Sequence, residues 1–129
     1  LFGGKLMQWV DLAASIAASR HARSAVVTAS IDSLTFLRPV HIGQLVTLRS
    51  AVNRVFRTSM EVGVKVFVED LRTGMVQHVS SAYLTFVAIS GEGRRVIPPP
   101  VLPETADELR RFEQAGQRRA YRLANRAAR

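Results

Sequence analysis

The chain has 129 residues, a length that favours a single domain. Its composition, 47% hydrophobic and 22% charged, is typical of a globular protein, and no apolar run approaches the roughly 18 residues that predict a membrane span. The absence of cysteine excludes a disulfide framework, a thiolate nucleophile and a cysteine-ligated zinc site. The net charge of +8 favours polyanionic partners, namely nucleic acid, anionic membranes or phosphorylated small molecules.

The first predicted element is a helix over residues 5–21. Its apolar side chains recur at helical spacing, at Leu6, Met7, Val10, Ala13, Ala14, Ala17 and Ala18. The many small residues would let another element approach closely. Gly3 and Gly4 stand just ahead of this helix and no Ser, Thr, Asp or Asn is placed to cap it, so we expect the glycines to have another role.

Four strands follow, because the hydrophobic period changes from 3.6 to 2. They are expected at residues 25–36, 44–57, 59–69 and 75–89. The alternation is strongest in the third strand, which places Val62, Val64, Val66 and Val68 on one side. The same alternation predicts that Thr28 and Ser30 point to one side of the first strand. Residues 70–74 are typical of a tight hairpin turn.

Long strands joined by short turns predict a strongly curved antiparallel sheet, and the helix is apolar enough to fill its concave side. This is the α+β architecture known as the hotdog fold. Residues 91–103 are rich in proline and predict an extended linker. Residues 104–128 predict a surface helix with many arginines and a thin apolar stripe, made of Leu109, Phe112, Ala115 or Gly116, and Leu123. The predicted organisation is a hotdog domain over 1–90, a linker over 91–103 and a basic C-terminal helix over 104–129.

Four sequence blocks resemble the acyl-CoA thioesterase branch of the hotdog superfamily. They are Leu1-Phe2-Gly3-Gly4 followed by Lys-Leu-Met-Gln-Trp-Val-Asp11, then Val27-Thr-Ala-Ser30, Leu34-Thr-Phe-Leu-Arg-Pro39 with Ile42-Gly43, and Thr58-Ser59-Met60-Glu61. The first block is specific, because a glycine pair, six residues and an aspartate on a helix resemble the active-site segment of bacterial and mammalian members. The arginine-rich tail is similar to that of cytosolic long-chain members.

The resemblance implies hydrolysis of fatty acyl-CoA, of medium to long chain, to a free acid and CoA. It implies no metal and no cofactor, since CoA takes part only as substrate moiety and product. The family's catalytic carboxylate falls on Asp11, as general base or as nucleophile. We expect the backbone N–H of Gly4, at the positive end of the helix, to stabilise the oxyanion. A second polar residue of the family, often an Asn, would precede Leu1.

The resemblance also implies contacts to CoA. In related members these contacts fall on Thr28, Ala29, Ser30, Arg57, Thr58, Ser59 and Arg119. The hydroxyls would bond the pantetheine amides and the arginines would bind phosphates. Taken without the resemblance, the threonine is an ordinary strand former and the arginines are a solvated basic edge.

The family forms homo-oligomers, so we expect a dimer with the active site at its interface and a hexamer built as a trimer of dimers. We expect a cytoplasmic location, because the sequence opens on Leu1 without a secretory signal. Two alternatives stay open, a non-catalytic acyl-CoA-binding module on the same fold and a basic nucleic-acid-binding domain. Asp11 argues against the first, and the lack of a nucleic-acid-binding motif argues against the second.

Overall fold

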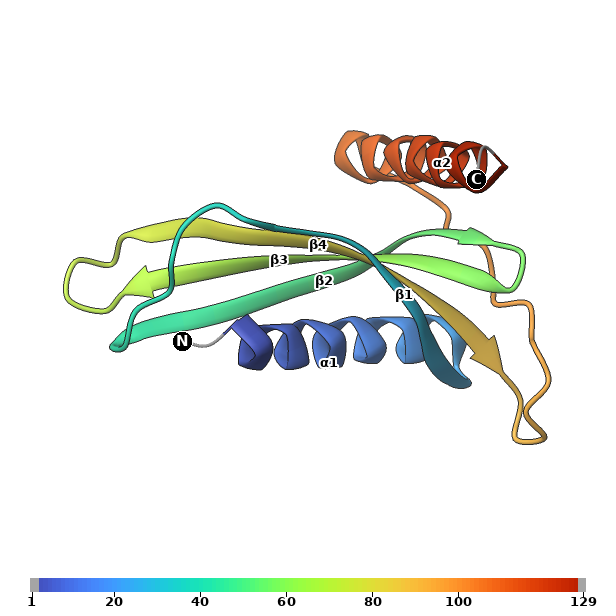
Figure 1. Cartoon of the computed structure of the whole chain (residues 1–129), viewed down its shortest axis with the longest axis horizontal. Helices are drawn as coiled ribbons and strands as arrows, with labels where there is room; N and C mark the ends of the chain where they lie inside the picture. The colour runs from blue at the N-terminus through green and yellow to red at the C-terminus, as the bar shows by residue number, and fades with distance from the viewer. Residues whose placement is uncertain (1–2, 128–129) are drawn as a thin grey trace.

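The computed structural model describes residues 3–127, so Leu1-Phe2 of the first sequence block and the last two residues of the predicted tail lie outside the described residues. The elements follow in the order α1 (Gly3–Ala22), β1 (Ala25–Phe36), β2 (Gln44–Phe56), β3 (Ser59–Asp70), β4 (Val76–Ile89) and α2 (Ala106–Ala127). Figure 1 shows that α1 lies along one face of the curved sheet and α2 across the opposite face. The predicted α+β hotdog architecture is confirmed.

Helix α1 begins at Gly3, earlier than the predicted residue 5, so the glycine pair forms its first turn. One side chain in every four is buried against the sheet, at Leu6, Val10, Ala14 and Ala18. The two alanines bring the helix backbone close to the strands. The helix ends at a left-handed residue, Arg23, with φ of 53° and an N–H that donates to the carbonyl of Ser19 at 2.8 Å.

The four strands form one antiparallel sheet in the order β1-β4-β3-β2, which leaves β1 and β2 at the edges. The predicted alternation in β3 is confirmed, because its inward side chains are fully buried, at Met60, Val62, Val64, Val66 and Val68. β4 contributes the adjacent inward row of Ala82, Leu84, Phe86 and Ala88. Full burial of a Val, Leu or Phe stabilises a fold by about 1.5–3 kcal/mol, so β3, β4 and α1 together form the core.

Two register shifts place polar side chains under α2. Asn53 is the extra residue at the shift between β2 and β3, and Asp32 is the extra residue at a shift between β1 and β4. A β-bulge of this kind turns a side chain out of the regular alternation. Both side chains are almost fully buried. Neither position is marked by the hydrophobic pattern, because a bulge depends on the partner strand.

The predicted thin apolar stripe makes only a small contribution to the contacts between α2 and the sheet. Leu109 and Leu123 of that stripe are about half exposed, whereas Ala115 is fully buried. Within residues 3–127 neither helix combines the length and apolarity needed to cross a bilayer. The contacts that fix α2 are made mainly by arginines.

One of these arginines comes from the sheet. Arg54 of β2 lies over the ring of Phe112, with Cζ at 3.9 Å from the ring centroid, and its Nη1 donates to the Phe112 carbonyl at 3.3 Å. Gly116 leaves room for the guanidinium, since an added Cβ would lie 2.5 Å from Nη1. The helix therefore approaches β2 at a glycine.

A buried ion pair fixes the middle of α2. Glu61 of β3 is 1% exposed and accepts two hydrogen bonds from Arg118, at 2.7 Å from Nε and 2.8 Å from Nη2. Nδ2 of Asn53 donates to the same carboxylate at 2.9 Å, and the Tyr83 ring lies 3.7 Å from the Arg118 Cζ. The hydrogen bonds to Glu61 outweigh the effect of burial and raise the pKa of Arg118.

Removing the cation of this pair is expected to destabilise the fold strongly. Arg118→Ala leaves Glu61 buried without its counter-charge, which typically costs about 3–5 kcal/mol in the free energy of unfolding. The loss would be measured as a lower denaturant midpoint at constant slope.

Arg110→Ala is the matched control on the same helix. Arg110 pairs with Asp107 at 3.4 Å on the exposed side, and such pairs contribute at most about 1 kcal/mol. Equal destabilisation by the two variants would contradict the role given to the buried pair.

Candidate functional site

Asp11 and Thr28 meet where α1 lies beside the edge strand β1. Oγ1 of Thr28 donates a 2.8 Å hydrogen bond to Oδ1 of Asp11. Thr28 faces α1 because it pairs with Phe86, whose side chain is fully buried in the core. Asp11 is partly exposed and Thr28 is exposed, so the pair is accessible from outside the chain. The structure thus joins two of the predicted site residues.

Gly4 lies in the first turn of α1, where backbone N–H groups have no acceptor within the helix. A Cβ added at Gly3 or Gly4 would meet no atom of the described residues within 4 Å, so packing among residues 3–127 does not require glycine at either position. The glycines instead keep the outside of the helix backbone open to an approaching group. Gly4 lies nearly two turns ahead of Asp11, on the same side of α1 and about 10 Å away along the axis.

The prediction that Thr28 and Ser30 point to one side of the strand is wrong. The register shift between them makes Ala29 an extra residue, and a bulge reverses the alternation. Thr28 therefore faces α1, whereas Ser30 pairs with Thr85 and faces the layer of α2. Two predicted site residues that are two positions apart on β1 therefore lie on opposite faces of the sheet.

The other predicted coenzyme-binding residues line one cavity of about 640 Å³ between β1, the turn that joins β2 to β3, and α2. They are Ala29, Ser30, Arg57, Thr58, Ser59 and Arg119. Thr28 is the exception, because it lies on the far side of the bulge. Residues from three distant parts of the sequence therefore converge on one concave surface.

Arginine is the most frequent residue in the lining of this cavity, and no described residue that lines it is an Asp or a Glu. The arginines are Arg57, Arg95, Arg119, Arg122 and Arg126. Three of them, Arg95, Arg122 and Arg126, were not among the predicted contacts. Positions 119, 122 and 126 did carry a signal, since spacings of three and four place side chains on one helix face. Arg95 lies in the proline-rich segment and carried none.

Contacts hold the Arg119 side chain in place, and Arg57 has a strained backbone. Nη1 of Arg119 donates to Oγ of Ser59 at 3.3 Å, and its guanidinium lies 4.7 Å from the centroid of the Phe56 ring. Arg57 occupies the tight turn between β2 and β3 with a left-handed φ of 61°. This conformation costs a residue other than glycine about 1–2 kcal/mol. Backbone strain of this kind concentrates at functional sites.

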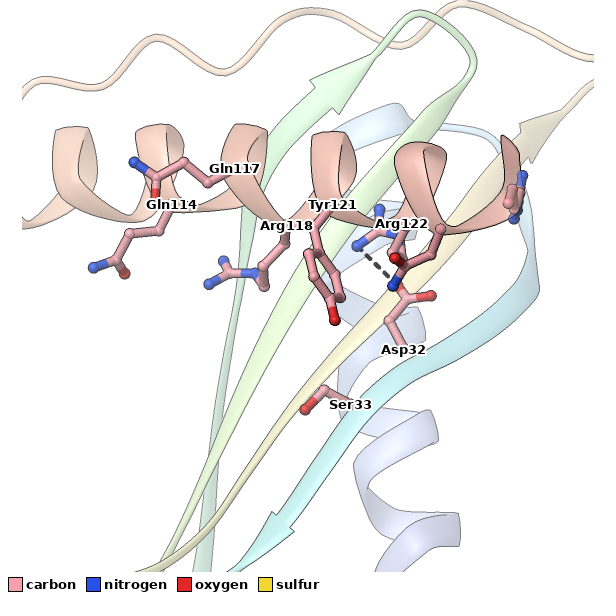
Figure 2. Close-up of a pocket in the computed structure, with 9 residues that line it drawn as sticks. Asp32, Ser33, Gln114, Gln117, Arg118, Tyr121 and Arg122 are labelled. Atoms are coloured by element: carbon pink, nitrogen blue, oxygen red, sulfur yellow. Dashed lines mark ion pairs between the residues drawn. The ribbon is translucent and has the colours of Figure 1, made fainter. Parts of the chain in front are cut away.

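A second cavity, of about 880 Å³, shares Arg122 and Arg126 with the first. Figure 2 shows Arg118, Tyr121 and Arg122 reaching from α2 toward the sheet, with Asp32 of β1 beneath them. Within residues 3–127 no group of three or more His, Asp and Glu side chains is placed to hold a metal ion.

The surface beside Asp11 and Thr28 is apolar and uncovered. Leu12 and Ile16 on α1 are 59% and 51% exposed, and Val27 on β1 is 47% exposed. β1 is also an edge strand, with backbone groups available for pairing. Exposed apolar side chains beside an unpaired strand are typical of an interface between chains.

Comparison with known proteins gives concordant matches. The model of the thioesterase superfamily matches residues 1–75. The uncharacterized acyl-CoA thioester hydrolase YkhA of Bacillus subtilis is 48% identical over 118 residues, which covers 92% of this chain and 69% of that relative.

Solved structures agree over almost the whole chain. A hexameric acyl-CoA thioesterase in its apo form superposes with a TM-score of 0.95 at 40% identity, covering 100% of this chain and 83% of the other. An acyl-CoA hydrolase from Staphylococcus aureus, solved with butyryl-CoA, CoA and CoA disulfide, gives a TM-score of 0.92 at 38% identity, covering 99% and 78%. The chain therefore belongs to the hotdog-fold acyl-CoA thioesterase family of thioester hydrolases.

Proposed function

We propose that this protein hydrolyses fatty acyl-CoA of medium to long chain to a free fatty acid and CoA, with Asp11 as the catalytic carboxylate. The hydrogen bond between Asp11 and Thr28 carries this proposal. It holds Oδ1 and leaves Oδ2 to take a proton from water or to attack the thioester carbonyl. The first-turn N–H of Gly4 supplies the oxyanion donor. Exposed Leu12 and Val27, next to these two residues in sequence, offer apolar surface to an acyl chain.

Variants of the Staphylococcus aureus enzyme support the choice of residues. An aspartate and a threonine were each changed to alanine in that enzyme, and the two stand 17 positions apart, as Asp11 and Thr28 do here. A third variant changes an asparagine to alanine. When the aspartates are matched, that asparagine falls ahead of Leu1.

The arginine-lined cavity supports CoA as the leaving group. CoA carries a diphosphate and a further phosphate on its ribose, and guanidinium groups bind such oxygens in pairs. A concave site that gathers arginines from the turn and from α2 fits a compact phosphorylated molecule better than an extended nucleic acid. Coenzyme A is then substrate moiety and product, and the proposal includes no cofactor and no metal.

The proposed active unit is a homodimer in which the partner covers the apolar flank beside Asp11, and three dimers form a hexamer. Two neighbouring structures are named as hexameric thioesterases. A cytoplasmic location is proposed with it, because a human relative 34% identical over 114 residues is named a cytosolic acyl-CoA thioester hydrolase.

Replacement of the carboxylate tests the reaction directly. Asp11→Asn and Asp11→Ala are expected to lower kcat for thiol release from palmitoyl-CoA by about 10²–10⁴-fold, the usual contribution of a general base. Binding of CoA, measured by calorimetry, is expected to persist.

The control for this experiment is Glu92→Gln, a carboxylate on the exposed turn after β4. Equal rates for the wild type and both Asp11 variants would refute the assignment. A wild type that binds acyl-CoA but releases no thiol would establish the non-catalytic binding module instead.

Arg57 is expected to bind CoA at the expense of stability. In Arg57→Gly the relief of about 1–2 kcal/mol of strain exceeds the roughly 0.5–1 kcal/mol entropy cost of glycine, so the free energy of unfolding rises slightly. The KM for acyl-CoA is expected to rise about tenfold with the loss of a charge-assisted contact.

Arg23→Gly is the matched control, because Arg23 is also left-handed but lies after α1, away from the cavity. It is expected to stabilise the fold and leave KM unchanged. An unchanged KM in Arg57→Gly would remove Arg57 from the CoA site.

The oligomer is tested by light scattering. The wild type is expected at six times the chain mass of 14.2 kDa, and Val27→Lys, which buries a charge at the β1 edge, is expected to yield smaller species. Leu71→Lys in the exposed turn after β3 is expected to leave the mass unchanged. A monomeric wild type at micromolar concentration would refute the proposed assembly.

A further inference from the structure

Asp32 is a nearly buried carboxylate on the wall between the two cavities. Its Oδ1 accepts a 2.6 Å hydrogen bond from Oγ of Ser30, and its Oδ2 accepts one of 2.6 Å from Oγ1 of Thr85. Both distances are in the range of a hydroxyl that donates to a charged carboxylate. Ser30 and Thr85 also line the arginine-rich cavity, so Asp32 connects directly to the proposed CoA site.

These two bonds determine what the hydroxyls offer to a ligand. A hydroxyl has a single proton, and Ser30 and Thr85 give theirs to Asp32. Their remaining lone pairs can only accept hydrogen bonds from the cavity. This part of the wall is therefore complementary to N–H groups, such as those of the pantetheine amides or of the adenine amine, and not to phosphate oxygens.

The same carboxylate faces an unused donor on α2. Nη1 of Arg122 lies 3.7 Å from Oδ2 of Asp32, an ion pair drawn dashed in Figure 2. This nitrogen is buried and has no hydrogen-bond partner among the described residues. Because this nitrogen has almost no accessible surface, a ligand cannot reach it, and its attraction to Asp32 holds the guanidinium from the protein side. The Arg122 side chain as a whole is 25% exposed and lines the arginine-rich cavity, so the other N–H groups of the guanidinium can bind a phosphate oxygen there.

We propose that Asp32 is a positioning residue for coenzyme recognition, which holds Arg122 for a CoA phosphate and keeps Ser30 and Thr85 as acceptors for CoA N–H groups. This inference rests on the proposed function and extends it to residues that make no contact with the thioester. It adds Arg122 to the part of the binding site that Arg119 already supplies from α2.

The experiment compares steady-state kinetics of the full chain with Asp32→Asn, an isosteric change that removes the charge. The expected result is a KM for acyl-CoA raised about tenfold with kcat within about twofold, together with an equal rise in the Kd of CoA measured by calorimetry. Ser33→Ala is the control, because Ser33 is the exposed neighbour on β1. Its KM is expected to equal that of the wild type.

A double-mutant cycle separates positioning from a general structural effect. If Asp32 acts through Arg122, then Asp32→Asn changes the KM of an Arg122→Gln variant much less than it changes the KM of the wild type. Should Asp32→Asn fail to fold, Arg122→Gln alone tests the contact from the helix side, with the same tenfold rise expected.

A KM for Asp32→Asn, or for Arg122→Gln, within twofold of the wild type would overturn the inference while leaving thioester hydrolysis intact. An Asp32 effect of undiminished size in the Arg122→Gln background would also overturn it. Failure of the wild type itself to bind CoA would instead refute the proposed function, so the two failures are distinguishable.

Discussion

Two carboxylates on the outer face of the sheet determine how the C-terminal helix is attached. A buried carboxylate is costly unless a cation and hydrogen bonds compensate it, and both Glu61 and Asp32 are nearly buried. Arg118 and Arg122, one turn apart on α2, face these two acids. Because both ion pairs must form at once, they determine where α2 lies on the sheet. That position also carries Arg119 to the cavity, so the proposed coenzyme site depends on charge pairing more than on apolar packing.

The parts of the fold that could be predicted are those determined locally. The alternation of Val62 to Val68 follows from period alone and is buried as expected. Of the apolar side chains predicted on α1, Leu6, Val10, Ala14 and Ala18 are buried, whereas Met7 is 38% exposed. The bulges at Ala29 and Asp32 could not be predicted, because register belongs to a pair of strands. The docking of α2 was missed for a related reason. Arginines in a sequence indicate a solvated face until the acids that pair with them are located in space.

The proposed catalytic half of the site is less complete in one chain than the coenzyme half. Arginines from the turn and from α2 surround the cavity, whereas Asp11 stands on an exposed flank with only Thr28 as a described hydrogen-bond partner. The glycines at the start of α1 are also open to a partner, because no described residue lies within 4 Å of a Cβ added at either of them. A chain that recognises the coenzyme by itself and completes its reactive centre by association would couple activity to assembly.

The bulge at Ala29 has a consequence for how this protein can change in evolution. In a regular strand, deletion of one residue turns every following side chain to the other face of the sheet. Ala29 is an extra residue in the pairing with β4, so its deletion would leave Thr28 opposite Phe86 and Ser30 opposite Thr85. Thr28 would still face α1, and Ser30 would still face the layer of α2 beside Asp32. We therefore expect β1 to tolerate the loss of Ala29 among descendants of this sequence, whereas the regularly paired residues around it keep their number.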